Sequence, residues 1–149
     1  MIRRYGEAVQ TGQKYIRRPG VYGVLLRGRE VLLTFQEEPL PEYQLPGGGI
    51  DKGEAPIAAL HREVFEETGW HINTPRWLGT YRRFTYMPDY DLWAEKVCTI
   101  FLARPTLQMG PPSEAGHTAI WAGAQAAVDL LDNVGDRSML IYALRQAGI

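Results

Sequence analysis

The sequence predicts an α+β fold, an α/β/α sandwich with a mixed β-sheet. Strand patterns precede and follow one amphipathic helix in the stretch 48–70, and two further helical patterns end the chain. That order of elements is typical of layered structures in which helices pack on a sheet. The 149 residues suit one domain, 1–149, that buries about two-thirds of its unfolded surface.

Composition narrows the class of protein. The formal net charge of −1 offers no broad cationic surface for nucleic acid or acidic membranes. Cys98 is the only cysteine, which excludes an internal disulfide and fits a reducing compartment. The chain has no run of 18 apolar residues and no apolar signal-peptide core near its start. We therefore expect a cytoplasmic monomer or homodimer with no nucleic-acid or membrane partner.

The first 19 residues are polar and basic. An irregular edge hairpin would accommodate them, with the charges forming a solvated face. The alternative is a grip on phosphate, for which Arg17 and Arg18 are the better candidates because they directly precede the first clear strand pattern.

Two strands, 21–26 and 30–35, are rich in leucine and β-branched residues and predict a hairpin. An exposed loop over 36–42 follows. The glycines at 47–49 then predict a tight turn, because glycine lets the backbone bend where a side chain would collide and lets a carbonyl approach a cation.

The helix after this turn carries two different faces. Pro56 suits its first turn. At 100° per residue, four positions fall within about 80° of one another and predict a packing face; these are Ile57, Leu60, Val64 and Thr68. Glutamates occupy a separate arc of about 100°; these are Glu63, Glu66 and Glu67.

The acidic arc is unfavourable by itself. Like charges three and four residues apart destabilise a helix by a few tenths of a kcal/mol per pair. A solvated acidic face is the plain alternative, but Mg²⁺ or Mn²⁺ among the carboxylates would offset the repulsion. Arg62 lies 40° from Glu66 on a helical wheel, so its guanidinium can orient that carboxylate or pair with Glu54. We interpret the helix as one side of a metal–phosphate site.

The rest of the chain alternates strands with connections. We expect a strand over 74–84, an aromatic segment over 85–90, a strand over 93–104, a Pro/Gly-rich loop over 105–117 and a strand over 118–122. Cys98 in the second strand is interpreted as a small buried residue, because nothing nearby activates a thiol.

Two helices complete the prediction. The first covers 123–131, and Asp136 is expected to cap the last one, which ends at Gly148. Its inward residues are expected to be Met139, Leu140, Ala143 and Leu144.

The central stretch also resembles a known signature. Gly48, Glu54 and the run REVFEETGW over 62–70 have the spacing of the 23-residue Nudix box of the Nudix hydrolases. Seven near-fixed positions coincide by chance about once in a million or more chains of this size. Trp70 stands where the family has an aliphatic residue, and Ala55 where a Ser or Thr often caps the helix.

The resemblance implies a sandwich fold and Mg²⁺- or Mn²⁺-dependent hydrolysis of a nucleoside diphosphate linked to another moiety. It implies Glu66 and Glu67 as metal ligands, Glu63 as a further ligand or the base, and Arg62 as an orienting residue. A backbone oxygen of Gly48 or Gly47 is implied as a further ligand. Some family members recruit a glutamate outside the box, for which Glu114 and then Glu95 are the candidates.

The substrate is less defined. Lys52 is either a phosphate contact or an exposed side chain. Aromatic side chains can stack on a nucleobase or fill the core; the candidates are Phe84, Tyr86, Tyr90 and Trp93. The small size favours a nucleotide or dinucleoside polyphosphate pyrophosphatase, while nucleotide sugars and ADP-ribose stay open. We give His61, His71 and His117 only minor candidacy for catalysis.

Two other classes stay open. A catalytically inactive Nudix-like module would sense or bind a nucleotide, and a purely structural domain would do neither. The three clustered carboxylates argue against both, because neither class needs them.

Overall fold

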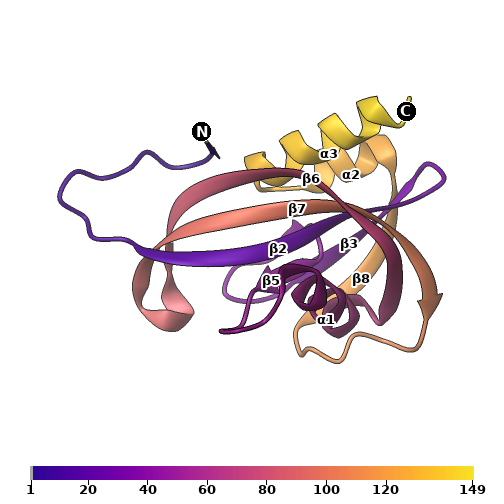
Figure 1. Cartoon of the computed structure of the whole chain (residues 1–149), viewed down its shortest axis with the longest axis horizontal. Coiled ribbons are helices and arrows are strands. Elements are labelled where there is room, and N and C mark those ends of the chain that lie inside the picture. Colours follow the sequence, from indigo (N-terminus) through magenta and orange to yellow (C-terminus); the bar gives the residue numbers. More distant parts are fainter. Residues whose placement is uncertain (1) are drawn as a thin grey trace.

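The computed structural model describes residues 2–149 as a curved sheet between two helical layers (Figure 1). Helix α1 (Pro56–Thr68) covers one face of the sheet. Helices α2 (Ala124–Leu130) and α3 (Val134–Gln146) cover the other. The predicted α/β/α arrangement is confirmed, whereas the assignment of 1–149 to one domain stays a prediction.

The sheet is mixed, as predicted. Its path is β1-β6-β7-β2-β3-β4, with β5 paired to β2 and β8 paired to β3. Strands β2 and β7 run parallel, whereas β6 and β7 are antiparallel. The strands are β1 (Arg3–Arg4), β2 (Ile16–Arg27), β3 (Glu30–Gln36), β4 (Glu42–Gln44), β5 (Gly47–Gly49), β6 (Trp70–Met87), β7 (Leu92–Gln108) and β8 (His117–Gly123).

Two cores form because the central strands bury both faces. Along β2, side chains alternate, so Val21 and Leu25 pack with α1, whereas Val24 packs with α2 and α3. Strand β3 repeats the pattern, with Leu32 on the α1 side and Leu33 on the other. The hairpin predicted over these residues is confirmed, joined where Arg27 pairs with Glu30.

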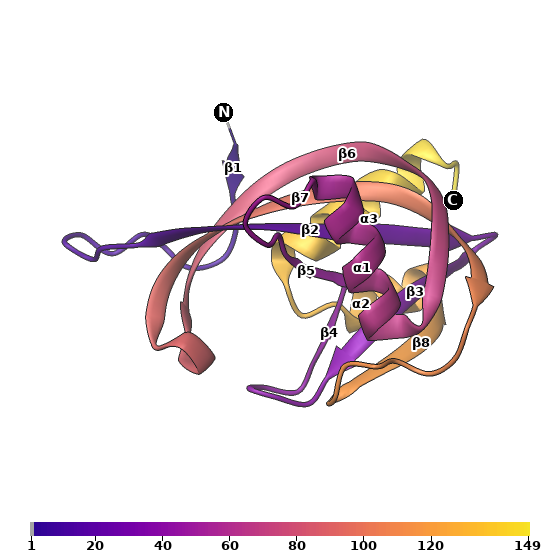
Figure 2. The same ribbon diagram turned by 60° about the horizontal axis from the view of Figure 1, so that its bottom comes forward.

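Helix α1 begins as predicted, and three of its four predicted inward residues, Leu60, Val64 and Thr68, are fully buried. Pro56 occupies the first turn, and Ala55 provides no side-chain cap. Ile57 is 46% exposed, which contradicts its predicted inward position, whereas Glu67 is only 5% exposed. The reason is that α1 lies across both β2 and β5 (Figure 2), so the buried arc turns toward the glycine strand. Gly69 ends the helix with φ 76°, and its N–H bonds the carbonyl of Phe65.

Several strand boundaries differ from the prediction. Strands β6 and β7 pair almost from end to end through the turn at Pro88–Tyr90. Their ladder hydrogen bonds draw in residues whose side chains are not patterned for burial, so β7 continues to Gln108 through part of the predicted loop. The expected N-terminal hairpin is also wrong: β1 joins β6 in parallel, and β2 begins at Ile16.

Helix α3 is capped by a different residue from the one predicted. The side chain of Asn133 accepts hydrogen bonds from the N–H groups of Gly135 and Asp136, at 2.8 and 3.3 Å. Asp136 is instead 4% exposed and faces the core. Leu140 and its inward neighbours one turn later are buried as expected. Among residues 2–149, no helix combines the length and apolar composition needed to cross a membrane.

Candidate active site

A cavity of about 540 Å³ opens beside α1, at the point where β5 meets β2. Backbone from the glycine turn and side chains from several strands, from α1 and from the loop before β8 line it. Its polar lining includes Arg18, Gln36, Gln44, Lys52, Glu63, Glu67, Lys96, Glu114 and His117. One cavity thus brings together residues from seven separate parts of the chain.

Glu67 is the buried carboxylate of this cavity. Its Oε1 accepts a hydrogen bond of 3.0 Å from the N–H of Gly47. Burial raises the pKa of Glu67 well above its ordinary value of 4.5, although the Gly47 N–H opposes the shift. The ionised form of the Glu67 carboxylate is therefore unfavourable by itself, and a cation that enters the cavity would stabilise it.

Arg62 holds the neighbouring acidic groups in place. Its Nε and one terminal nitrogen donate to the two carboxylate oxygens of Glu54, each at 2.8 Å. Its other terminal nitrogen donates to Glu63 at 3.0 Å and reaches Glu66 at 3.4 Å. The bond to Arg62 is the main reason that the pKa of Glu54 falls to about 2. Both pairings considered from the sequence, with Glu54 and with Glu66, therefore occur together.

Glu63 is held against the glycine turn. A Cβ atom at Gly48 would lie 2.5 Å from Glu63 Oε2, so only glycine leaves the carboxylate where it is. Partial burial raises the pKa of Glu63, and the charge of Arg62 opposes that shift. The predicted juxtaposition of the Gly48 backbone with the acidic helix is present.

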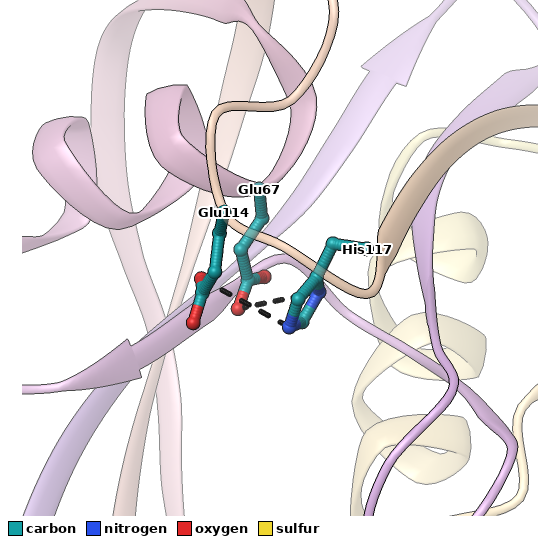
Figure 3. A group of neighbouring side chains, drawn as sticks. All are labelled: Glu67, Glu114 and His117. Atoms are coloured by element: carbon teal, nitrogen blue, oxygen red, sulfur yellow. Dashed lines mark ion pairs between the residues drawn. The ribbon is translucent and has the colours of Figure 1, made fainter.

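The loop after β7 adds a carboxylate and an imidazole. Backbone N–H groups of Ser113 and Glu114 bond the carbonyl of Glu66, at 2.9 and 3.0 Å, and place Glu114 over the acidic face. His117 Nε2 lies 3.9 Å from Glu114 Oε2, and Nδ1 lies 3.9 Å from Glu67 Oε2 (Figure 3). The other candidate, Glu95, faces Arg82 at 3.4 Å and does not line the cavity.

The donor set fits a hard divalent cation. Ligand atoms of Glu63, Glu66 and Glu114 lie within 4.8 Å of one another, and the same holds for Glu67, Glu114 and His117. Carboxylate oxygens are the ligands that Mg²⁺ and Mn²⁺ prefer. Glu67, 5% exposed, makes one hydrogen bond through Oε1 and leaves Oε2 without a donor among residues 2–149.

Cationic and aromatic groups also line the cavity. The guanidinium of Arg18 lies 4.6 Å from the ring centre of Tyr90, which is 58% exposed. Lys52 is exposed beside the turn and lines the cavity. Arg17 is exposed and outside the lining, because successive side chains of β2 point to opposite faces.

The other aromatic candidates have different environments. Tyr86 donates its hydroxyl hydrogen to Asp91 and lies outside the cavity lining. Phe84 is 8% exposed, edge-on to Tyr15 at 4.8 Å, so it belongs to the core. Trp93 packs against the rings of both tyrosines, Tyr15 and Tyr86.

Two residues of the cavity were missed or undervalued in the sequence. Lys96 lines it from β7, and burial lowers the pKa of its ammonium group. The signal was a lysine sharing its strand face with Ala94 and Cys98, a position typical of a buried side. His117 gave no such signal, because it follows a long connection between β7 and β8 whose path cannot be predicted from the sequence. Cys98 is buried as expected, and burial raises the pKa of its thiol to about 11.

Comparison with known proteins agrees with the geometry. The NUDIX domain profile matches residues 16–142, so the chain belongs to the Nudix family. Members of this family act on nucleotide-derived small molecules and generally use a divalent metal. The chain is also similar in fold to a solved NUDIX hydrolase of Nitrosomonas europaea, with a TM-score of 0.70, 18% identity, and 89% of this chain and 90% of that chain covered.

Curated relatives match over shorter stretches. A Bacillus subtilis protein named for 8-oxo-dGTP diphosphatase activity is 30% identical over 74 residues, which cover 50% of each chain. An RNA pyrophosphohydrolase of Cereibacter sphaeroides is 47% identical over 50 residues, covering 32% of this chain and 31% of the relative. The chain thus spans half or less of the length of these two relatives.

Proposed function

We propose that the protein hydrolyses a pyrophosphate bond in a nucleoside diphosphate linked to another moiety. One observation carries the proposal: a carboxylate cluster with a buried member shares a cavity with the cationic side chains of Arg18, Lys52 and Lys96. A nucleotide pyrophosphate is a polyanion that needs both a cation at the acidic side and direct positive charge. The substrate class favoured is a nucleotide or dinucleoside polyphosphate.

The acidic residues of α1 would hold Mg²⁺ or Mn²⁺. Glu66 and Glu67 are the proposed direct ligands, together with the backbone carbonyl of Gly48. When bound, such a cation neutralises phosphate charge and makes a water molecule more acidic. Arg62 keeps the set assembled, since its guanidinium bonds Glu54 and Glu63 and reaches Glu66.

The remaining groups bind, orient and accept a proton. Arg18, Lys52 and Lys96 are proposed to contact phosphate oxygens, and Tyr90 to stack on the base or ribose. Water attacks one phosphorus atom, the bond from that phosphorus to the bridging oxygen breaks, and the leaving phosphate keeps the electron pair. Glu63 is the proposed proton acceptor, because its carboxylate lines the cavity next to the glycine turn and the proposed metal ligands. Glu114 borders the same water-accessible space.

A substrate screen tests the proposal. The panel contains 8-oxo-dGTP, a dinucleoside polyphosphate, a nucleotide sugar, ADP-ribose and an RNA oligonucleotide with a 5′-triphosphate, each with Mg²⁺, with Mn²⁺ and with a chelator. We expect metal-dependent release of a phosphate product from at least one nucleotide, and ¹⁸O-labelled water identifies the phosphorus attacked. The RNA substrate also tests the expectation that nucleic acid is not a partner.

The screen also separates the enzyme from a nucleotide sensor. A sensor would bind a nucleotide tightly in the calorimeter and release no product with any metal. That result across the whole panel would overturn the proposed hydrolysis.

A further inference from the structure

His117 stands out because its imidazole faces two carboxylates at equal distance. Each ring nitrogen lies 3.9 Å from a carboxylate oxygen, of Glu67 on one side and of Glu114 on the other. Only 11% of the His117 side chain is exposed. Figure 3 shows the three side chains converging from α1, from the loop before β8 and from the start of β8.

A hydrogen bond to Thr34 holds the imidazole ring of His117 in place. Thr34 Oγ1, on β3, lies 3.1 Å from His117 Nδ1, and Thr34 is fully buried. A histidine that binds a metal through one nitrogen almost always bonds a protein group through the other. With Nδ1–H donated to Thr34, the lone pair of Nε2 points to the carboxylate of Glu114.

The carboxylates leave ligand positions open at this point. Glu67 is 5% exposed, and its Oε2, the atom nearest the ring, has no hydrogen-bond donor in the part of the chain that the structure describes. Two atoms that each lie about 2.1 Å from one octahedral cation are about 3.0 to 4.2 Å apart. The 3.9 Å between His117 Nε2 and Glu114 Oε2 falls inside that range. One ligand atom each of Glu67, Glu114 and His117 lie within 4.8 Å of one another, so a small shift of the side chains would place all three around one cation.

We propose that Glu67, Glu114 and His117 form a second cation position with mixed nitrogen and oxygen ligands, which takes Mn²⁺ in preference to Mg²⁺. The first position, proposed above for Glu66, Glu67 and the Gly48 carbonyl, offers oxygen ligands alone, and Glu67 is shared between the two positions. Imidazole nitrogen favours transition-metal ions over Mg²⁺, which keeps oxygen ligands and water. The inference deepens the proposed function and rests on its cation site.

Pulsed electron paramagnetic resonance of the full-length protein with Mn²⁺ tests this directly. Electron spin-echo envelope modulation detects a ¹⁴N nucleus bonded to Mn²⁺ without any turnover. We expect ¹⁴N modulation in the wild type, and we expect His117→Gln to abolish it and to weaken binding of one Mn²⁺ by at least about tenfold. Mg²⁺ added in large excess should leave the nitrogen-bound Mn²⁺ in place.

Two variants sharpen the test. His71→Gln removes a histidine that stacks on Phe65 outside the cavity, so the modulation should persist. Thr34→Val removes the supporting hydroxyl and should keep the ¹⁴N signal while weakening Mn²⁺ about tenfold, the size of effect found for such supporting groups.

Three results would overturn the inference. Mn²⁺ bound without ¹⁴N modulation would leave the carboxylate site and the proposed hydrolysis standing, and would make His117 a proton acceptor or a structural residue. Modulation that survives His117→Gln would assign the nitrogen to another group. A failure to bind Mn²⁺ at all, even with nucleotide present, would overturn both this inference and the proposed function.

Discussion

Two buried carboxylates reach the glycine turn from opposite layers of the sandwich. Asp136 of α3 is 4% exposed and Glu67 of α1 is 5% exposed. Asp136 accepts from the Tyr81 hydroxyl at 2.6 Å and from the Leu45 N–H at 3.3 Å, so both oxygens are paired. Glu67 accepts one bond, from Gly47, and turns its other oxygen to the cavity.

The difference separates a fully bonded acid from one that is proposed to bind a cation. A buried carboxylate with all its hydrogen bonds made fixes the elements that it joins, here α3, β6 and the chain before the turn. A buried carboxylate with an unpaired oxygen is unfavourable when it is ionised, and a bound cation can compensate its charge. The segment 45–47 is therefore bonded at Leu45 to the structural carboxylate of Asp136 and at Gly47 to the proposed metal ligand Glu67.

The largest expected effect is on turnover. Glu67→Gln keeps the shape and the bond from Gly47 but removes the charge, so we expect turnover to fall at least about a hundredfold through weaker metal binding. Urea unfolding of the metal-free variant should show no loss of stability, since a costly buried charge is gone. Near-normal turnover would contradict the assignment of Glu67 to the metal.

The corresponding change in the other layer should affect stability instead. Asp136→Ala leaves the Tyr81 hydroxyl and the Leu45 N–H without their partner, which is expected to lower the free energy of unfolding by about 2 kcal/mol. Urea denaturation measures it, with Tyr81→Phe as the milder control at about 1 kcal/mol. A change below that of the control would show that Asp136 does not hold these elements together.

Gly135, in the layer of Asp136, and Gly48, beside the acidic helix, allow the same comparison between stability and turnover. A Cβ at Gly135 would lie 2.2 Å from the buried ring of Tyr81, so Gly135→Ala should cost about 1 to 2 kcal/mol of stability. The three atoms nearest to a Cβ at Gly48 all belong to the Glu63 carboxylate, the end of a flexible side chain. Gly48→Ala should therefore change stability by less than about 0.5 kcal/mol and reduce turnover by about tenfold. Equal losses of stability in both variants would remove the distinction.

The smallest expected effect is a difference in how the free energy of unfolding changes with pH in the wild type and in Glu67→Gln. Burial raises the pKa of Glu67 above its ordinary value of 4.5. The native state then binds more protons than the unfolded state, so stability falls as pH rises from about 4.5 toward the raised value. Glu67→Gln lacks this contribution, so its stability relative to the wild type should increase between about pH 5 and about pH 8 in chelator. A parallel pH dependence of the two proteins would contradict the raised pKa.

Local patterns were sufficient to predict the helix, the hairpin and the acidic cluster. Leu60 and Val64 recur at helical spacing, and Pro56 marks the first turn of the same helix. The boundaries of β6 and β7 were not predictable in this way, because ladder hydrogen bonds between distant segments extended both strands.

The site residues also divide into those predictable from local spacing and those placed by contacts between distant segments. Glu63 and Glu66 were found from their spacing, because residues three apart on a helix are always neighbours. Asp136 was expected to be a cap, since an acidic residue near a helix start usually is one; the structure places its carboxylate against Tyr81. His117 became a site residue only because β8 pairs with β3 and brings the ring to Thr34.

The sequence by itself determined the family, the sandwich and a helix with glutamates on one arc, because these follow from periodicity and spacing within a short stretch of chain. Only the tertiary structure decided that Glu67 is buried with an open oxygen, that Asp136 is buried and fully bonded, and that the imidazole of His117 lies between Glu67 and Glu114. Those outcomes depend on how far each group lies from solvent and from partners remote in sequence, and no local pattern contains those distances.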